Sequence, residues 1–323
     1  MLTVVGNTSI DIILRGVSRL PELSGNGTDA GSVARITEPV LSMLGGSGGM
    51  TAFAAAALGE MVRLWSSVGS DPLGELALNW LEGRHVDTTS VRISGDAGTS
   101  TTILISGEEG AGGALYYAGV ADLFAPRVRA VGGGGTDWLL VTGYAQMPMW
   151  RGDNTLELLR NARRAGVNTA LSTGPSFDKP VDPAELEPLL RYTGVLLSDG
   201  PELQALSKTK SLEKAVAWIF EAGAKSLLLR EPAEGAILFD SADSDGEKVA
   251  PFSNQPDVGT AIPGWTESFD AGFLFARGRG DSPQDSVRFG LACAALVAGA
   301  KRGSLDSPTE AAVRGFLDKQ PEA

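Results

Sequence analysis

The sequence predicts one α/β domain over residues 1–323, with a mainly parallel central sheet between two layers of helices and a small β-lid beside it. From residue 137 onward, short apolar runs alternate with amphipathic segments, which is typical of a parallel sheet covered on both faces. In the first half, two β-prone segments with Gly-rich turns, about 12–40 and 96–118, interrupt this order. We expect them to pair outside the main sheet as the lid.

The first half of the chain opens with an apolar run that ends in turn formers and continues past a lone carboxylate, Asp11. Further on, Ser70 or Asp71 is placed to cap a helix that Pro72 opens. Apolar periodicity and turn residues predict strands at 2–7 and 62–68, a continuation of the first strand at 10–14, and helices at 48–58 and 72–81.

The second half is regular, and its last third is helical. Periodicity predicts strands at 138–142, 168–171, 194–197, 226–229 and 236–239, and helices at 153–165, 183–191, 211–222, 266–277, 283–298 and 309–319.

Composition excludes several classes of function. The 323 residues include 27 basic and 39 acidic ones, a formal net charge of -12, so the basic footprint of a nucleic-acid binder is missing. The single cysteine, Cys293, lies in an apolar helical segment and is expected to be buried, and with one histidine, His85, we expect no metal site of protein ligands. We expect no membrane span and no signal peptide, and therefore a cytoplasmic protein.

Two stretches carry candidate chemistry. Gly45 to Gly49 form a glycine-rich loop before an Ala-rich helix, where either a ligand or another backbone approaches closely. Near the C-terminus, Gly264 to Leu274 has the form of a helix start built around one acidic residue, Glu267, and aimed at an anion.

In order and spacing these pieces resemble the ribokinase-like (PfkB) carbohydrate kinase family. The resemblance rests on four motifs: the Gly-Gly-x-Gly helix start, the Val-Gly-x-Asp-x-x-Gly turn at 68–74, the family's Gly-Val-Asp step, which reads His-Val-Asp at 85–87, and Ser-Phe-Asp-Ala-Gly-Phe-Leu at 268–274. It spans nearly the whole chain and implies a ribokinase-like three-layer α/β/α fold with a lid. It also implies transfer of a phosphoryl group from ATP, with Mg²⁺, to a hydroxymethyl group of a sugar or nucleoside.

On the acceptor side, the resemblance implies that Asp11 binds sugar hydroxyls and that the glycine-rich loop contacts the substrate. The loop residues that carry over are Gly45, Gly46 and Gly49, while Met50 stands where the family has an asparagine. A surface turn carboxylate is the alternative for Asp11.

At the catalytic turn, Gly264 is kept, but Trp265, Thr266 and Glu267 replace the family's Ala, Gly and catalytic Asp, and Ala261 departs from the motif further upstream. Glu267 is therefore the candidate base, with Gly264 and Thr266 forming the anion hole. β-branched Thr266 is expected to resist a positive φ. Trp265 either closes the pocket and stacks on a ligand or fills the space beneath the turn.

On the nucleotide side, the family's Asn-x-x-Glu motif corresponds to Asp199 and Glu202, and its Thr-x-Gly-x-x-Gly corresponds to Arg230 through Gly235. Asp199 can hold a metal-bound water. Arg230 either contacts donor phosphates or pairs with Glu231 on the surface.

Two functional hypotheses follow. The first is an ATP-dependent sugar kinase that uses Glu267 as a variant base. The second is a catalytically degenerate relative that binds a sugar, nucleoside or nucleotide as a sensor or regulatory protein. The resemblance also implies a possible homodimer formed through the lid.

Overall fold

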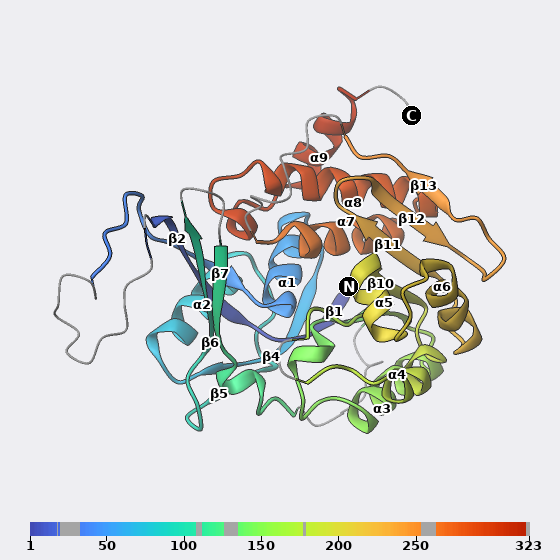
Figure 1. Cartoon of the computed structure of the whole chain (residues 1–323), viewed down its shortest axis with the longest axis horizontal. Helices are drawn as coiled ribbons and strands as arrows, with labels where there is room; N and C mark the ends of the chain where they lie inside the picture. Colours follow the sequence, from blue (N-terminus) through green and yellow to red (C-terminus); the bar gives the residue numbers. More distant parts are fainter. Residues whose placement is uncertain are drawn as a thin grey trace.

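The computed structural model describes residues 1–17, 19, 33–107, 112–125, 135–176, 179–252 and 263–320. Within these ranges the strands form two sheets, a large one of nine strands and a smaller one of four. In Figure 1 the smaller sheet stands at one side of the main body. The predicted ribokinase-like α/β architecture with a small β-lid is confirmed.

The large sheet is mainly parallel. Its strand order is β13-β12-β11-β10-β9-β8-β1-β4-β5. Neighbours from β11 to β5 run parallel, and β12 and β13 add an antiparallel edge. Its strands are β1 (Leu2–Val5), β4 (Val62–Gly69), β5 (Val91–Ser94), β8 (Trp138–Val141), β9 (Asn168–Ser172), β10 (Val195–Asp199), β11 (Leu227–Glu231), β12 (Gly235–Phe239) and β13 (Glu247–Val249).

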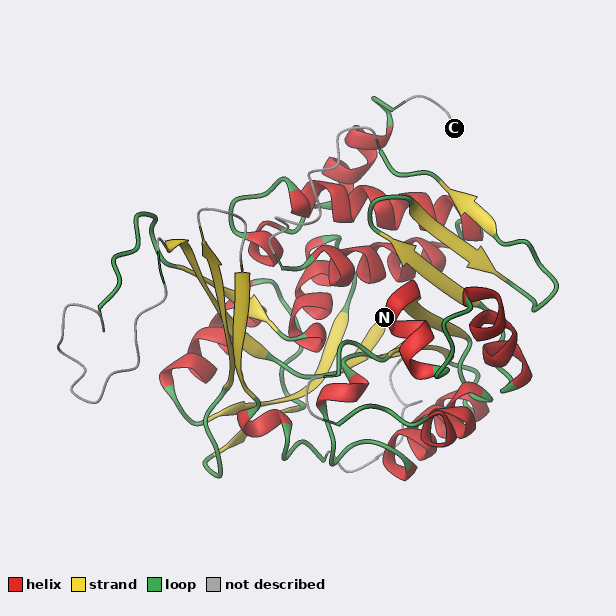
Figure 2. Ribbon diagram, in the orientation of Figure 1, coloured by secondary structure: helices red, strands yellow, loops and turns green. Residues whose placement is uncertain are grey.

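Helices cover both faces of this sheet (Figure 2). One hydrophobic core joins the sheet to α1, α2, α7 and α8, and a second core joins it to α3, α4, α5 and α6. Strand β8 shows the alternation: Leu140 belongs to the first core, and Leu139 and Val141 to the second. The helices are α1 (Ser47–Ala57), α2 (Pro72–Gly83), α3 (Asp153–Arg164), α4 (Pro183–Leu190), α5 (Gly200–Leu206), α6 (Leu212–Glu221), α7 (Trp265–Arg279), α8 (Pro283–Ala298) and α9 (Glu310–Leu317), with short 3-10 turns at Gly119–Ala121, Tyr144–Gln146 and Gly303–Asp306.

The smaller sheet is the predicted lid, and we call it the lid sheet. It consists of β2 (Ser9–Val17), β3 (Leu41–Gly45), β6 (Ser100–Gly107) and β7 (Gly112–Tyr117) in the order β3-β2-β6-β7. Strands β2 and β6, which lie largely within the two predicted segments, pair outside the main sheet, whereas β3 lies just beyond the predicted bound at residue 40. The parts of these segments at residues 18, 20–32 and 108–111 lie outside the described residues.

The prediction that residues 10–14 continue the first strand is wrong. The chain leaves the main sheet after Val5 and enters the lid sheet at Ser9. Both pieces are apolar, so their pattern alone could not show that they belong to different sheets.

Some local predictions are refined by the structure. Helix α5 was not expected, because seven residues are too short to display a helical period. Asp71 caps α2 by accepting a hydrogen bond from the Gly74 N–H at 2.9 Å, with Pro72 in the first turn, as predicted. Cys293 is buried, as expected. Across the described ranges, no helix combines the length and apolarity needed to cross a bilayer.

Candidate active site

A cavity of about 790 Å³ opens at the carboxyl ends of β9, β10 and β11, beside the first turn of α7. In open α/β sheets this edge is where ligands bind. The structure brings seven of the sequence-predicted residues to its wall: Met50, Asp199, Glu202, Arg230, Gly264, Thr266 and Glu267.

The first turn of α7 presents backbone donors to this cavity. The helix is 15 residues long, and its N-cap, Gly264, has φ 114° and no capping hydrogen bond from a described side chain. The first N–H groups of a helix have no partner within the helix, and the helix dipole makes this end partially positive. The turn is therefore a place for an anion, which supports the predicted anion hole.

The strain expected for Thr266 does not arise. The left-handed conformation is taken by Gly264, and Thr266 lies within α7, outside the described non-glycine residues with positive φ, His85 and Lys208. Its backbone N–H belongs to the helix's first turn.

Trp265 fills space beneath the turn. Its indole is 6% exposed and stacks on Phe269, with ring centroids 5.7 Å apart and an interplanar angle of 10°. The ring packs into the core, although the residue also contributes to the cavity wall. Of the two alternatives from the sequence, the structure therefore supports space filling.

Glu267 lies where α7, α1 and the lid sheet meet. The Ser47 hydroxyl donates a hydrogen bond to Glu267 Oε1 at 3.1 Å, which joins the first turns of α1 and α7. Burial raises the pKa of Glu267, its own backbone N–H and Ser47 lower it, Arg230 lowers it further, and Asp11 raises it. The carboxylate is thus half-buried at the cavity wall and held there by Ser47.

Arg230 is buried, and the predicted surface pairing with Glu231 is wrong. Its side chain is 3% exposed and donates from Nη1 to both oxygens of Asp270, at 2.8 and 2.7 Å. A second carboxylate, Glu202, has Oε2 3.7 Å from Nη2. Strand β11 ends at the cavity, so the side chain turns towards α5 and α7 and away from solvent.

Asp199 and Glu202 form the start of α5. Asp199 caps this helix, accepting a hydrogen bond from the Glu202 N–H at 2.7 Å. Glu202 accepts hydrogen bonds from the hydroxyls of Thr173 and of Ser198, the latter at 3.3 Å. Burial raises the pKa of Glu202, while Arg230 lowers it.

Asp11 is buried in β2 and is not a surface turn residue. Hydroxyls of Ser9, at 3.2 Å, and of Thr102 donate to it, and burial nevertheless raises its pKa to about 6. Gly45 lies against the carboxylate: a Cβ there would be 2.1 Å from Asp11 Oδ1. A glycine is needed at this position because any side chain would collide with the candidate acceptor anchor.

The remaining predicted glycines lie at the starts of secondary-structure elements or pack closely against other residues. Gly46 is the N-cap of α1 with φ 76°, and Gly49 lies in α1 beside Thr8. Gly235 begins β12 with φ 99°, where a Cβ would be 2.0 Å from the Val249 carbonyl oxygen. Gly235 is not among the residues that line the cavity, and a nucleotide contact for it stays a prediction.

Sequence reasoning missed Ser47 and Asp270. Asp270 is 1% exposed and lies three residues after Glu267 in α7. Its signal in the sequence was a lone carboxylate in an apolar segment, because such a group is rarely buried without a partner. Ser47 gave no signal beyond its place in the glycine-rich loop.

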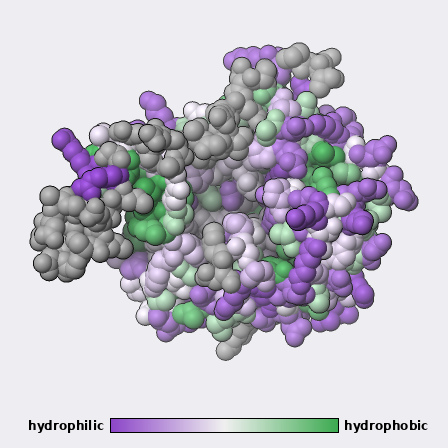
Figure 3. Space-filling view, viewed as in Figure 1, coloured by the Kyte–Doolittle hydropathy of each residue, from purple (hydrophilic) through white to green (hydrophobic). Residues whose placement is uncertain are grey.

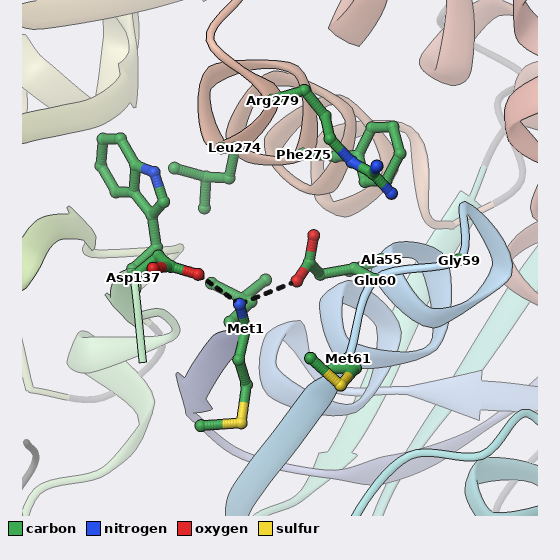
Figure 4. Close-up of a pocket in the computed structure, with 12 residues that line it drawn as sticks. Met1, Ala55, Gly59, Glu60, Met61, Asp137, Leu274, Phe275 and Arg279 are labelled. Atoms are coloured by element: carbon green, nitrogen blue, oxygen red, sulfur yellow. Dashed lines mark hydrogen bonds and ion pairs between the residues drawn. The ribbon is translucent and has the colours of Figure 1, made fainter. Parts of the chain in front are cut away.

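A second cavity, of about 290 Å³, lies at the opposite edge of the sheet (Figure 4). It is lined by the starts of β1 and β8 and by the last turns of α7, and the amino group of Met1 is ion-paired there with Glu60 at 3.1 Å and Asp137 at 2.6 Å. Ligands of open α/β sheets bind at the carboxyl ends of strands. This cavity is therefore not the candidate active site.

The described part of the chain thus combines a mainly parallel sheet, a lid sheet beside it and a helix start at the cavity wall with a carboxylate, Glu267, in its first turn. The model of the family described as pfkB family carbohydrate kinase matches residues 1–310. The chain belongs to this family.

Individual relatives agree with this assignment. The chain is 27% identical, over 98% of its length and 97% of the relative's, to an ATP-dependent ribose-1-phosphate kinase of Halopiger xanaduensis. It is 24% identical, over 86% of its length and 85% of the relative's, to a 5-dehydro-2-deoxygluconokinase of Clostridium beijerinckii. The structure of Arabidopsis thaliana ribokinase complexed with ribose and ATP has a TM-score of 0.81 at 21% identity, with 99% of both chains covered, and supports the fold.

Proposed function

We propose that this protein is an ATP-dependent kinase that phosphorylates a hydroxymethyl group of a sugar. One observation carries the proposal: the first turn of α7, which includes Glu267, lines the cavity, and the Ser47 hydroxyl holds the Glu267 carboxylate there. A kinase active site needs a carboxylate to take the acceptor's proton and donors to stabilise the transferring phosphoryl group, and this cavity wall has both.

Each residue has a part in this reaction. Asp11 accepts hydrogen bonds from the acceptor's hydroxyls and so fixes the sugar beneath the lid sheet. Glu267, held by Ser47, takes the proton of the attacking hydroxyl. The N–H groups of the first turn of α7 face the oxygens of the transferring group and stabilise their charge without reorganising.

Mg²⁺ would neutralise phosphate charge in this reaction. The described residues contain no cluster of three or more acidic, His or Cys side chains that could hold a metal. Asp199 lines the cavity and uses Oδ1 for capping α5, which leaves its other oxygen for a metal-bound water. This donor set fits an ion held chiefly by the substrate phosphates and water.

The acceptor we favour is a sugar that carries a negative charge. Both curated relatives have names that point to such acceptors, ribose-1-phosphate in one and a gluconate derivative in the other. Ribose and nucleosides, which carry no such group, are the comparison.

The test is an ADP-release assay with ATP and Mg²⁺ against ribose-1-phosphate, 5-dehydro-2-deoxygluconate, ribose and nucleosides. We expect turnover with an anionic sugar, and expect Glu267→Gln to lower it by roughly 10² to 10⁴-fold, the usual contribution of a general base, with binding kept. Glu234→Gln, at an exposed pair with Lys248, is the matched control. Binding of sugar and nucleotide without turnover would contradict the proposal and favour a sensor.

We also propose that the lid sheet pairs with a second copy of this chain. Ile12, Ile103 and Leu115 lie opposite one another across β2, β6 and β7, and Leu115 and Tyr117 are 61% and 53% exposed. Figure 3 shows apolar residues at the surface of the lid. Light scattering should give a dimer that Leu115→Lys weakens and that Met61→Lys, at an exposed position away from the lid, leaves unchanged. A monomeric wild type would contradict this.

A further inference from the structure

Three elements converge on the Arg230 guanidinium. Arg230 is the next-to-last residue of β11, Asp270 lies on α7, and Glu202 lies on α5. The contacts are 2.8 and 2.7 Å to the oxygens of Asp270 and 3.7 Å to Glu202. Arg230 is 3% and Asp270 1% exposed, so this is a buried ion pair at the wall of the cavity.

Stability does not explain why such a pair stands here. The cost of removing two charges from water consumes much of their attraction, and apolar residues of similar size often serve a core as well. The charge of Arg230 is, moreover, already matched by Asp270 and Glu202, with Asp199 also acting on it. A donor phosphate would have to compete with these carboxylates for it.

Glu267 is the neighbour that gains from this charge. Asp270 follows it by three residues, which places the two side chains on adjoining turns of α7. The groups that act on Glu267 are Ser47 from α1, Asp11 from the lid sheet and Arg230 from β11, and Asp270 on the same helix interacts with it as a like charge. Burial and Asp11 favour the protonated form of Glu267, whereas Arg230 favours the ionised form that a base requires.

We propose that Arg230 and Asp270 are a positioning pair for Glu267, in which Asp270 holds the guanidinium beside the buried base as its permanent counter-charge. This inference rests on the proposed function, because it explains how Glu267 acts as a base in the proposed kinase reaction. Burial raises the pKa of Asp270, whereas the Arg230 guanidinium, which donates to both of its oxygens, lowers it and so favours the ionised form. Donor phosphates, in this arrangement, depend on the helix start more than on Arg230.

The experiment compares Arg230→Gln, Asp270→Asn and the double variant. We expect Arg230→Gln to move the acid limb of the kcat/KM profile upward by about one pH unit or more, a tenfold loss per unit on that limb. Asp270→Asn should leave the limb in place or move it downward, because the guanidinium remains and loses a competing anion. The double variant should melt above Arg230→Gln, because Asp270 is no longer a buried charge without a partner and Glu202 keeps its hydrogen bonds from Thr173 and Ser198, and it should still show the raised limb.

A second readout does not need turnover. In protein labelled with ¹³C at glutamate carboxyls, the Glu267 signal is assigned by its loss in Glu267→Gln and titrated in each variant. Arg230→Gln and the double variant should both raise its pKa. If the wild type shows no turnover, the kinase proposal fails while this titration still decides whether Arg230 serves Glu267.

The matched control is the Arg151–Glu185 pair, a partly buried pair with Nη2 2.7 Å from Oε2 that is outside the lining of the cavity. Arg151→Gln should lower stability and leave the Glu267 titration unchanged. The inference is overturned if the double variant recovers the wild-type profile and titration. It is equally overturned if Arg230→Gln lowers ATP affinity, measured by calorimetry, tenfold or more while Glu267 titrates as in the wild type, because Arg230 would then be a phosphate ligand.

Discussion

The two halves of the candidate site are built from different kinds of polar group. In the proposed acceptor half, a single buried carboxylate, Asp11, lies outside the lining of the cavity and is surrounded by hydroxyls and by Gly45. In the donor half, Arg230 is enclosed by the carboxylates of Asp270 and Glu202. Because the partners of Asp11 are neutral, its charge is not balanced within the protein and is available to a ligand. The charges of Arg230, Asp270 and Glu202 balance one another, so each depends on the others.

Because of this difference, we expect the effects of substitutions to be independent of one another in the acceptor half and coupled in the donor half. A change at one hydroxyl of the acceptor half removes one hydrogen bond. Removal of one charge in the donor half leaves another charge buried without a partner, which is costly. The two residues here that depart from the family's motifs, Arg230 and Glu267, are each tied to a partner, Arg230 to Asp270 and Glu267 to Ser47.

The largest effect is expected on the stability of the donor half. Trp265→Ala should lower the free energy of unfolding by about 3 to 5 kcal/mol, because it removes a buried ring that stacks on Phe269. Denaturant unfolding measures this, with Trp265→Phe as a control that keeps a stacked ring. A loss below 1 kcal/mol would show that the indole is not part of the core.

The next effect concerns the base. Glu267→Asp withdraws the carboxylate by one methylene from Ser47, and a misplacement of about 1 Å can lower a rate about 10²-fold. We expect kcat to fall by that factor, measured by ADP release, and Glu234→Asp to have no effect. Higher activity in Glu267→Asp, or in the triple change Trp265→Ala, Thr266→Gly, Glu267→Asp, would show instead that the site has decayed from the family's arrangement.

In the acceptor half, Asp11→Asn should weaken sugar binding by about 1.5 to 3 kcal/mol, the value of a hydrogen bond to a charged group. Melting temperature at pH 7.5 should be kept or raised, because the variant no longer buries an ionised carboxylate. Calorimetry and thermal unfolding check the two outcomes, with Asp122→Asn as a control at an exposed carboxylate outside the lining of the cavity. Unchanged sugar affinity would remove Asp11 from the acceptor half.

The smallest effect is on pH dependence. With the pKa of Asp11 at about 6, acceptor affinity should rise about tenfold between pH 5 and 7.5, as the carboxylate ionises. Because this pKa is raised from 3.8, the contribution of Asp11 to stability is present below pH 4 and is lost as pH rises through 6. Asp11→Asn should flatten both dependences. A wild-type affinity that does not change with pH would contradict the raised pKa.

The sequence by itself determined the elements and the register of the motifs. Apolar periodicity predicted the alternating strands and helices, because burial of one face makes apolar residues recur at the spacing of a helix or a strand within each segment. The motif register placed Gly264 to Glu267 at a helix start, and the structure has them there. Asp11 was visible as a carboxylate inside an apolar run.

Tertiary structure decided which of these residues meet. Arg230 reaches Asp270 across 40 positions and Ser47 reaches Glu267 across 220, and neither pairing leaves a periodic trace in the sequence. His85 takes φ 62°, a left-handed conformation that is uncommon for a residue with a side chain and that no apolar period in the sequence indicates. Local pattern fixes how each segment folds, but the partner of a buried charge depends on where the ends of β11, α1 and α7 converge once the sheet is assembled.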